Sequence, residues 1–140
     1  MNRILIAFVL TGFSLFAVAC GQNKVTDTGK DIKSVPVGNN LTVTLSNKDG
    51  AFKNGDNDFF VSFKDSSGKP VEVGAVGLKF QMPGMGTMPA MNAAATFTAT
   101  GTPGVYQGKV KLESAGDWHA QISYEGPAGK GKTPVTITAQ

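Results

Sequence analysis

The sequence predicts an all-β fold, an immunoglobulin-like antiparallel β-sandwich of about seven strands. Apolar and polar residues alternate in several short segments, with the period of a half-buried strand. Clusters of Gly, Asn and Asp separate these segments and supply the turns. After the first twenty residues, no window longer than a turn has the period of an amphipathic helix. A small barrel is the alternative that the same pattern allows.

The first three strands are expected in the first two thirds of the chain. In 41–45, leucine and valine alternate with threonine, a β-branched residue that favours strands. In 59–63, two phenylalanines and a valine form one inward face. In 76–81, Val, Leu and Phe occupy alternate positions, and Met82 continues their phase. We therefore expect Met82 to be mainly a core residue.

Four more strands are expected toward the C-terminus. The segment 95–100 alternates Ala and Thr around a phenylalanine, and 106–112 places its lysines opposite its apolar residues. In 118–124, Trp118 shares its phase with Ala, Ile and Tyr, so the indole is expected inside the core. The last strand is the Val-Thr-Ile-Thr segment at 135–138.

Residues 1–19 are expected to be a lipoprotein signal peptide. Arg3 gives a short positive head, and the apolar run that follows is too short and wrongly flanked for a membrane-spanning helix. The run ends Ala-Val-Ala-Cys-Gly at 17–21, which resembles a bacterial lipobox, in which the peptide is cut before the cysteine and the cysteine is lipidated. A plain signal peptide with a chance cysteine is the alternative. We expect an exported protein of the cell envelope, lipid-anchored through Cys20, in the outer membrane or at the periplasmic face if the cell is Gram-negative.

The mature chain is expected to comprise a lipidated cysteine and flexible tether at 20–36 and one sandwich domain at 37–140. The tether is polar and has little to bury. Because Cys20 is the one cysteine, the mature chain has no intramolecular disulfide and no thiolate metal site. Loss of Arg3 with the signal peptide lowers the net charge from +3 to +2. This balance, without a basic run, argues against nucleic acid as a partner.

The segment 82–91 holds every methionine of the chain except the initiator. Each methionine follows the last by three residues, and two prolines and two glycines lie between them, so we expect a loop or a sheet edge. Thioethers prefer soft cations such as Cu(I), and they are not lost to disulfide formation in an oxidising compartment. A soft-metal site is therefore one explanation, and a flexible apolar loop over the end of the domain is the other. The candidate metal ligands are Met82, Met85, Met88 and Met91.

The spacing of the methionines limits how many can bind one ion. The prolines and the three-residue repeat fit polyproline II, in which neighbouring methionines would be about 9 Å apart at ~3.1 Å rise per residue. Side-chain reach closes one such gap but not three in a straight run. Either the glycines bend the loop, or only two of Met85, Met88 and Met91 bind with a ligand from elsewhere.

Three loops share one end of the sandwich if successive strands alternate in direction: 47–57, 83–92 and 113–117. Acidic residues at this end would ring the methionines and attract a cation; they are Asp49, Asp56, Asp58, Glu113 and Asp117. His119, the one histidine, stands beside Trp118 at the same end and is expected to face outward. It is either a further metal ligand or an ordinary solvated side chain, and as a ligand it would make metal affinity fall at acidic pH.

Five short motifs occur in the order found in a known family. They are Gly55-Asp56-Asn57, residues 65–71, the Met-Pro-Gly-Met-Gly loop, Gly104-Val105-Tyr106 and Gly116-Asp117-Trp118. Together they resemble a YtkA-like domain, related to FixH, over roughly Leu41 to Ala139. This resemblance implies an immunoglobulin-like sandwich on an exported or membrane-anchored protein, often associated with copper handling or cytochrome oxidase assembly.

The resemblance also implies Met82 and Met85 as the metal candidates. The chain departs from the family pattern in one place, because many relatives carry a methionine just before the Gly-x-Trp motif. Here that segment is Glu-Ser-Ala-Gly at 113–116. A site relying on that methionine would be incomplete, and Met88 or Met91 would have to replace it.

The function expected from the sequence is a lipoprotein that binds Cu(I) for copper handling or delivery. Its partners would be the membrane, through the lipid, and copper-handling or oxidase-assembly proteins. The alternative is a non-metal interaction module that uses the methionine loop as an adaptable apolar patch. An enzyme is not expected, because no nucleophile has a recognisable base beside it and no glycine loop opens a helix.

Overall fold

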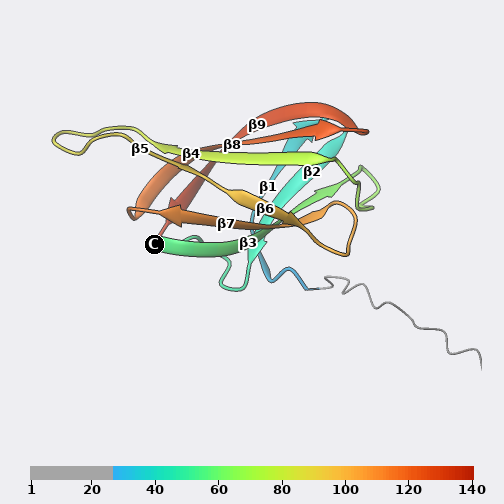
Figure 1. The fold of residues 1–140 in the computed structure, drawn as a ribbon, viewed down its shortest axis with the longest axis horizontal. Coiled ribbons are helices and arrows are strands. Elements are labelled where there is room, and N and C mark those ends of the chain that lie inside the picture. The colour runs from blue at the N-terminus through green and yellow to red at the C-terminus, as the bar shows by residue number, and fades with distance from the viewer. Residues whose placement is uncertain (1–26) are drawn as a thin grey trace, which may run out of the picture.

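The computed structural model describes residues 27–140, which form nine strands (Figure 1). The strands are β1 (Lys30–Gly38), β2 (Leu41–Asn47), β3 (Gly55–Lys64), β4 (Ala75–Met82), β5 (Met91–Ala94), β6 (Thr96–Ala99), β7 (Val105–Leu112), β8 (Gly116–Gly126) and β9 (Gly129–Ala139). The predicted signal peptide, Cys20 and the first part of the predicted tether lie outside the described residues. Within 27–140, no helix is long and apolar enough to cross a membrane.

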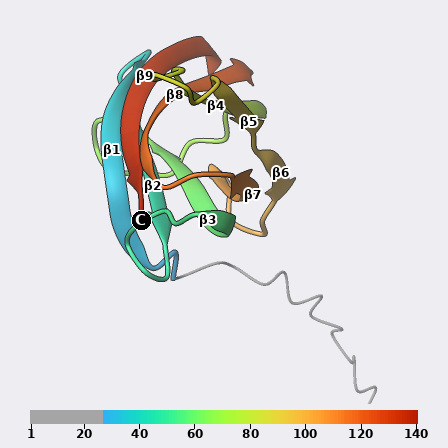
Figure 2. The same ribbon diagram turned by 90° about the vertical axis from the view of Figure 1, so that its left-hand side faces the viewer.

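The strands form two antiparallel sheets that pack face to face (Figures 1 and 2). One sheet has the order β1-β2-β3-β7-β6 and the other has the order β5-β4-β8-β9. The predicted all-β antiparallel sandwich is therefore confirmed, with nine strands rather than about seven. The strands expected from alternation are all present, and β1 and β5 are additional.

Strand β1 corrects the predicted boundary between tether and domain. Residues 30–36 pair with β2 instead of belonging to a flexible segment, so the sandwich begins before residue 37. This edge strand has one fully buried side chain, Val37, and its register is interrupted by two irregularities. Such a strand shows no clean alternation in the sequence. Asn39 and Asn40 join it to β2 with φ of 51° and 57°, as a two-residue hairpin turn of type I′ requires.

Aromatic side chains from both sheets fill the core. Phe52 meets Phe59 and Phe80 edge to face, with ring centroids 5.2 Å and 5.7 Å apart. Trp118 is fully buried, as its phase predicted, and its indole N–H donates to the Ser114 carbonyl at 3.0 Å. Met82 is half-buried and packs against this core, which is consistent with the expected inward phase.

The chain changes sheets between β5 and β6. The strand β5 pairs with β4 in one sheet, and after a single residue, Ala95, β6 pairs with β7 in the other. The Ala95 N–H donates to the Leu78 carbonyl at 2.9 Å, which fixes the crossing point to β4. Figure 2 shows β5 and β6 along one side of the sandwich and β1 beside β9 on the opposite side. The crossing anchors the base of the methionine segment to both sheets.

Candidate metal-binding site on the methionine hairpin

The methionine segment forms the outer part of a hairpin between β4 and β5, which projects from one end of the sandwich (Figure 1). The ladder runs from Lys79 opposite Ala94 to Met82 opposite Met91. Beyond it, an isolated bridge pairs Met85 with Met88 in the same register. We call residues 82–91 the methionine hairpin.

A two-residue turn closes the methionine hairpin. The Met85 N–H donates to the Met88 carbonyl at 3.1 Å, and the Met88 N–H donates to the Met85 carbonyl at 2.9 Å. Gly86, the first of the two central residues, has a φ of 58°, which glycine adopts without strain. Glycine at this position matches a type II′ turn, which suits the twist of paired strands. The extended polyproline II segment considered above therefore does not form, because the chain reverses at Gly86.

This reversal converts the three-residue repeat into two cross-strand pairs. Met85 lies opposite Met88, and Met82 lies opposite Met91. Directly opposed residues of an antiparallel pair have Cβ atoms roughly 4.5–5.5 Å apart. Met has three rotatable side-chain bonds, so both sulfurs of one pair can reach a common ion. The glycines do bend the loop, which is the first of the two possibilities left open by the sequence, and how many of the methionines bind stays a prediction.

The two pairs differ in environment. Met85 and Met88 are 73% and 52% exposed, and they are the exposed large hydrophobic residues of the described chain. Met82 and Met91 are half-buried and pack against the core cluster. Side chains alternate along a strand, so positions three residues apart face opposite sides of the ribbon, roughly 10 Å apart at ~3.3 Å per residue. We call Met85 and Met88 the tip pair and Met82 and Met91 the base pair.

The structure does not bring His119 to the tip pair. His119 is exposed on β8, as predicted, and lies opposite Gln81. Met85 is four residues beyond Gln81, or roughly 13 Å along a strand at ~3.3 Å per residue. The imidazole Nδ1 lies 3.4 Å from the Thr136 hydroxyl on the neighbouring strand. His119 therefore belongs to the outer face of the sheet, away from the turn.

The predicted arrangement of loops at one end is found. Gly55 lies opposite Leu112, and Gln81 lies opposite His119, so the three loops do share an end. The hairpin, however, projects beyond that end (Figure 1). Among residues 27–140, no three His, Cys, Asp or Glu side chains come together in a way that could hold a metal ion. Hence the methionines are the metal-ligand candidates that the structure gathers.

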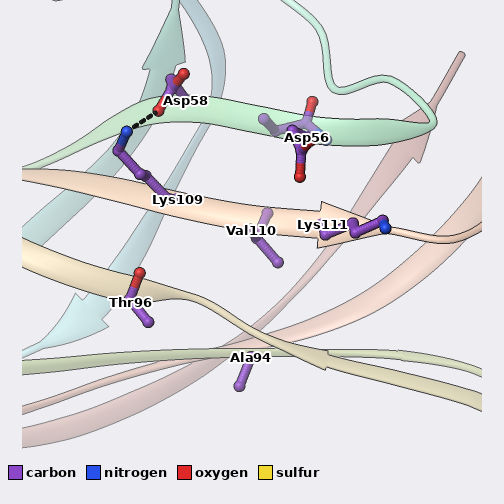
Figure 3. Close-up of a pocket in the computed structure, with 8 residues that line it drawn as sticks. Asp56, Asp58, Ala94, Thr96, Lys109, Val110 and Lys111 are labelled. Atoms are coloured by element: carbon purple, nitrogen blue, oxygen red, sulfur yellow. Dashed lines mark ion pairs between the residues drawn. The ribbon is translucent and has the colours of Figure 1, made fainter.

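A groove of about 550 Å³ lies where β5 crosses toward β6 (Figure 3). Its lining includes the ion pair between Lys109 and Asp58, with 3.2 Å between the ammonium and the carboxylate. Both side chains are mostly exposed, and such pairs contribute little to stability. Figure 3 shows Thr96 and Ala94 on the opposite wall. The rest of the lining combines two more charged side chains, Asp56 and Lys111, with Asn57 and Val110.

One partly buried contact was not foreseen in the sequence. The Tyr106 hydroxyl donates to the Glu72 carboxylate and accepts from the Val73 N–H at 3.3 Å. Glu72 also accepts from the N–H groups of Gly104 and Gly74, at 3.2 Å and 3.3 Å. The hydroxyl and these backbone groups stabilise the carboxylate and hold the pKa of Glu72 below its ordinary 4.5. This cluster ties the loop before β4 to the start of β7.

Replacing Tyr106 by phenylalanine should flatten the alkaline loss of stability. Burial, and then the hydrogen bond to Glu72, raise the pKa of Tyr106 from 10.0 to about 12. Because this folded-state pKa exceeds the unfolded one, the stabilisation is complete below pH 10 and is lost as pH rises toward 12. Urea unfolding of both proteins below and within this window measures the difference. An equal free-energy gap between them at every pH would contradict the assignment.

Comparison with known families gives one match. A family model described as YtkA-like matches residues 37–123, which include β2 to β7, most of β8 and the whole methionine hairpin. No curated protein and no solved structure matches the chain. The match covers more than half of the sequence.

Proposed function

The chain belongs to the YtkA-like family, and on that premise we propose that it binds Cu(I) at the tip pair of its methionine hairpin. We further propose that it is an exported lipoprotein and that it serves copper handling or delivery in the cell envelope. Copper-handling or oxidase-assembly proteins would be its partners. The observation that carries the proposal is the exposed, opposed pair Met85 and Met88.

The chemistry of the tip pair supports a soft cation. Thioether sulfur prefers Cu(I) to hard cations such as Mg²⁺ or Ca²⁺, which require oxygen ligands. Methionine is usually buried, so two exposed methionines at the end of a projecting hairpin are costly without a ligand or partner. The turn at Gly86 fixes the two sulfur-bearing strands side by side before any ion binds. An accessible site of uncharged donors also suits a protein that passes its ion on.

The competing proposal is a non-metal interaction module. Because Met85 and Met88 are exposed, the tip is also an adaptable apolar patch, and Met-rich surfaces accommodate varied partners. Leucine in place of methionine separates the two proposals, because leucine keeps the apolar surface and removes the soft donor.

The direct test is a titration of the full chain in detergent with Cu(I) against a competing colorimetric chelator. We expect the chain to withdraw Cu(I) from the chelator. Failure to compete, in a sample whose unfolding is cooperative, would leave the interaction module as the better proposal.

A site built from Met85 and Met88 alone should bind Cu(I) with almost constant affinity from about pH 7.5 to about pH 5, because a thioether has no proton to lose. A histidine ligand would instead lower the affinity by up to about tenfold per pH unit in the acidic range. The same titration, repeated across pH for the parent and for His119→Ala, measures this. A pH-dependent loss that disappears in His119→Ala would place the imidazole in the site.

Replacement of the lipidation residue should release the protein from the membrane. We expect Cys20→Ala to appear in the soluble envelope fraction, because the proposed anchor is the lipid on Cys20. Fractionation followed by immunoblotting of parent and variant measures the distribution. If the variant is as firmly membrane-bound as the parent, the lipid is not the anchor.

A further inference from the structure

We infer that two copies of the chain hold one Cu(I) ion between their hairpin tips, each copy supplying Met85 and Met88. This inference rests on the proposed function and goes beyond it, because it assigns the partner that completes the site. Its starting point is that one tip offers two neutral donors, whereas the ion accepts up to four.

One tip pair is half of a tetrahedral donor set. Cu(I) has the same filled d shell as Zn²⁺, so the d electrons impose no geometry, and four donors in a tetrahedron are the fullest of the arrangements open to it. Thioethers are uncharged and donate weakly, so two of them leave the ion exposed to water and to competing ligands. Met85 and Met88 lie opposite each other at the tip, and among residues 27–140 no three His, Cys, Asp or Glu side chains form a metal-binding group that could supply further donors.

No other soft donor of the described chain reaches the tip. The base pair, Met82 and Met91, packs against the core and belongs to the opposite face of the ribbon. His119 lies opposite Gln81, and Gln81 is four residues before Met85, so the imidazole is roughly 13 Å from the tip along the strand at ~3.3 Å per residue. Further donors therefore have to come from outside residues 27–140 of the same copy.

A cross-strand methionine pair has the dimension of one edge of such a tetrahedron. With metal–sulfur bonds of about 2.3 Å, two sulfurs on one ion lie roughly 3.8 Å apart. Opposed Cβ atoms roughly 4.5–5.5 Å apart bring two flexible thioethers to that separation. A second, identical pair turned by a two-fold axis supplies the other edge, which is the self-complementary arrangement of a symmetric dimer.

The composition of the hairpin favours a second copy as the occupant. Residues 82–91 contain no charged side chain, so two hairpins meet without like-charge repulsion. The turn residues, Gly86 and Thr87, are small. The hairpin projects from the sandwich (Figure 1), and this leaves room for the body of each protomer. A single bound cation joins two otherwise neutral tips.

The experiment combines a Cu(I) titration of the full chain in detergent with native mass spectrometry. We expect an endpoint of about 0.5 copper per chain, as a symmetric pair sharing one ion requires. We also expect a species of two chains and one copper, absent without copper. X-ray absorption at the copper edge should give about four sulfur neighbours near ~2.3 Å. Dilution of the protein should weaken apparent copper affinity, because dimer formation is coupled to binding.

Matched variants test whether the species of two chains and one copper is held together by the tip pair. Met85→Leu and Met88→Leu should each abolish the two-chain species, and Met91→Leu, which removes a sulfur from the base pair, should retain it. One copper per chain without dimerisation would overturn the inference and leave the proposed function standing. A dimer that forms without copper, or that survives in Met85→Leu, would also overturn it. Absence of any copper binding would remove the proposed function, and the inference with it.

Discussion

Replacing Met85 and Met88 together by leucine should lower Cu(I) affinity at least about a hundredfold. Mutating only the outer hydrogen-bond partners of a metal ligand typically costs about 10–100-fold, and this variant removes both proposed ligands. The thermal midpoint should hardly change, since the swap conserves volume and both side chains are exposed. Competition titration gives the affinity, and a circular dichroism melt gives the midpoint.

The base pair provides the matched control. Met82→Leu and Met91→Leu each remove a thioether from the same hairpin, and we expect each to leave Cu(I) affinity within about threefold of the parent, since neither touches the tip pair. Both sites are half-buried and packed on the core, so a small stability loss is expected there instead. Unchanged affinity in the Met85/Met88 double variant would favour the interaction module. A large loss in Met82→Leu would favour the ligand set implied by the family resemblance.

Truncating Trp118 to alanine should lower the free energy of unfolding by about 3–5 kcal/mol. The indole is fully buried between the sheets, so the change leaves a large cavity and removes the hydrogen bond to the Ser114 carbonyl. A domain of this size has only about 5–15 kcal/mol of stability in total. Urea unfolding monitored by circular dichroism measures the difference.

Trp118→Phe separates packing from hydrogen bonding. It keeps a buried ring but loses the indole donor. We expect it to lower the free energy of unfolding by about 1–3 kcal/mol, which is less than the alanine variant, because one carbonyl is left unpaired and the side-chain volume is reduced. If Trp118→Ala cost under about 1 kcal/mol, the indole would not be a core residue in solution.

Most of the sandwich was predictable because its strands have one buried face. The phase of Trp118 identified a core residue, and the same phase made His119 an exposed one, as observed. Strand β1 was missed for the converse reason. It is an edge strand with one fully buried side chain, so its sequence shows no alternation and resembles a tether.

The candidate site was predictable in composition but not in pairing. A three-residue repeat has the same appearance in an extended segment and in a hairpin, so the sequence left the arrangement open. The signal that distinguishes them is Gly86-Thr87 flanked by two methionines, a two-residue turn with glycine first. The contact of Tyr106 with Glu72 had no local signal, because the partners are 34 residues apart and meet only when the sandwich has formed.

The register of the methionine hairpin has a consequence for the entropy of metal capture. Two ligands on a flexible loop would have to be brought together at each binding event, and that cost grows with loop length. Here the two strands are already paired from Lys79 and Ala94 outward, and Ala95 anchors the pair where the chain crosses to the other sheet. Folding of the domain therefore restricts the backbone of both strands before any ion binds. The conformational entropy lost on metal binding is therefore mainly that of two thioether side chains. Capture of the ion is thereby linked to the integrity of the sandwich, and unfolding of the domain should release it.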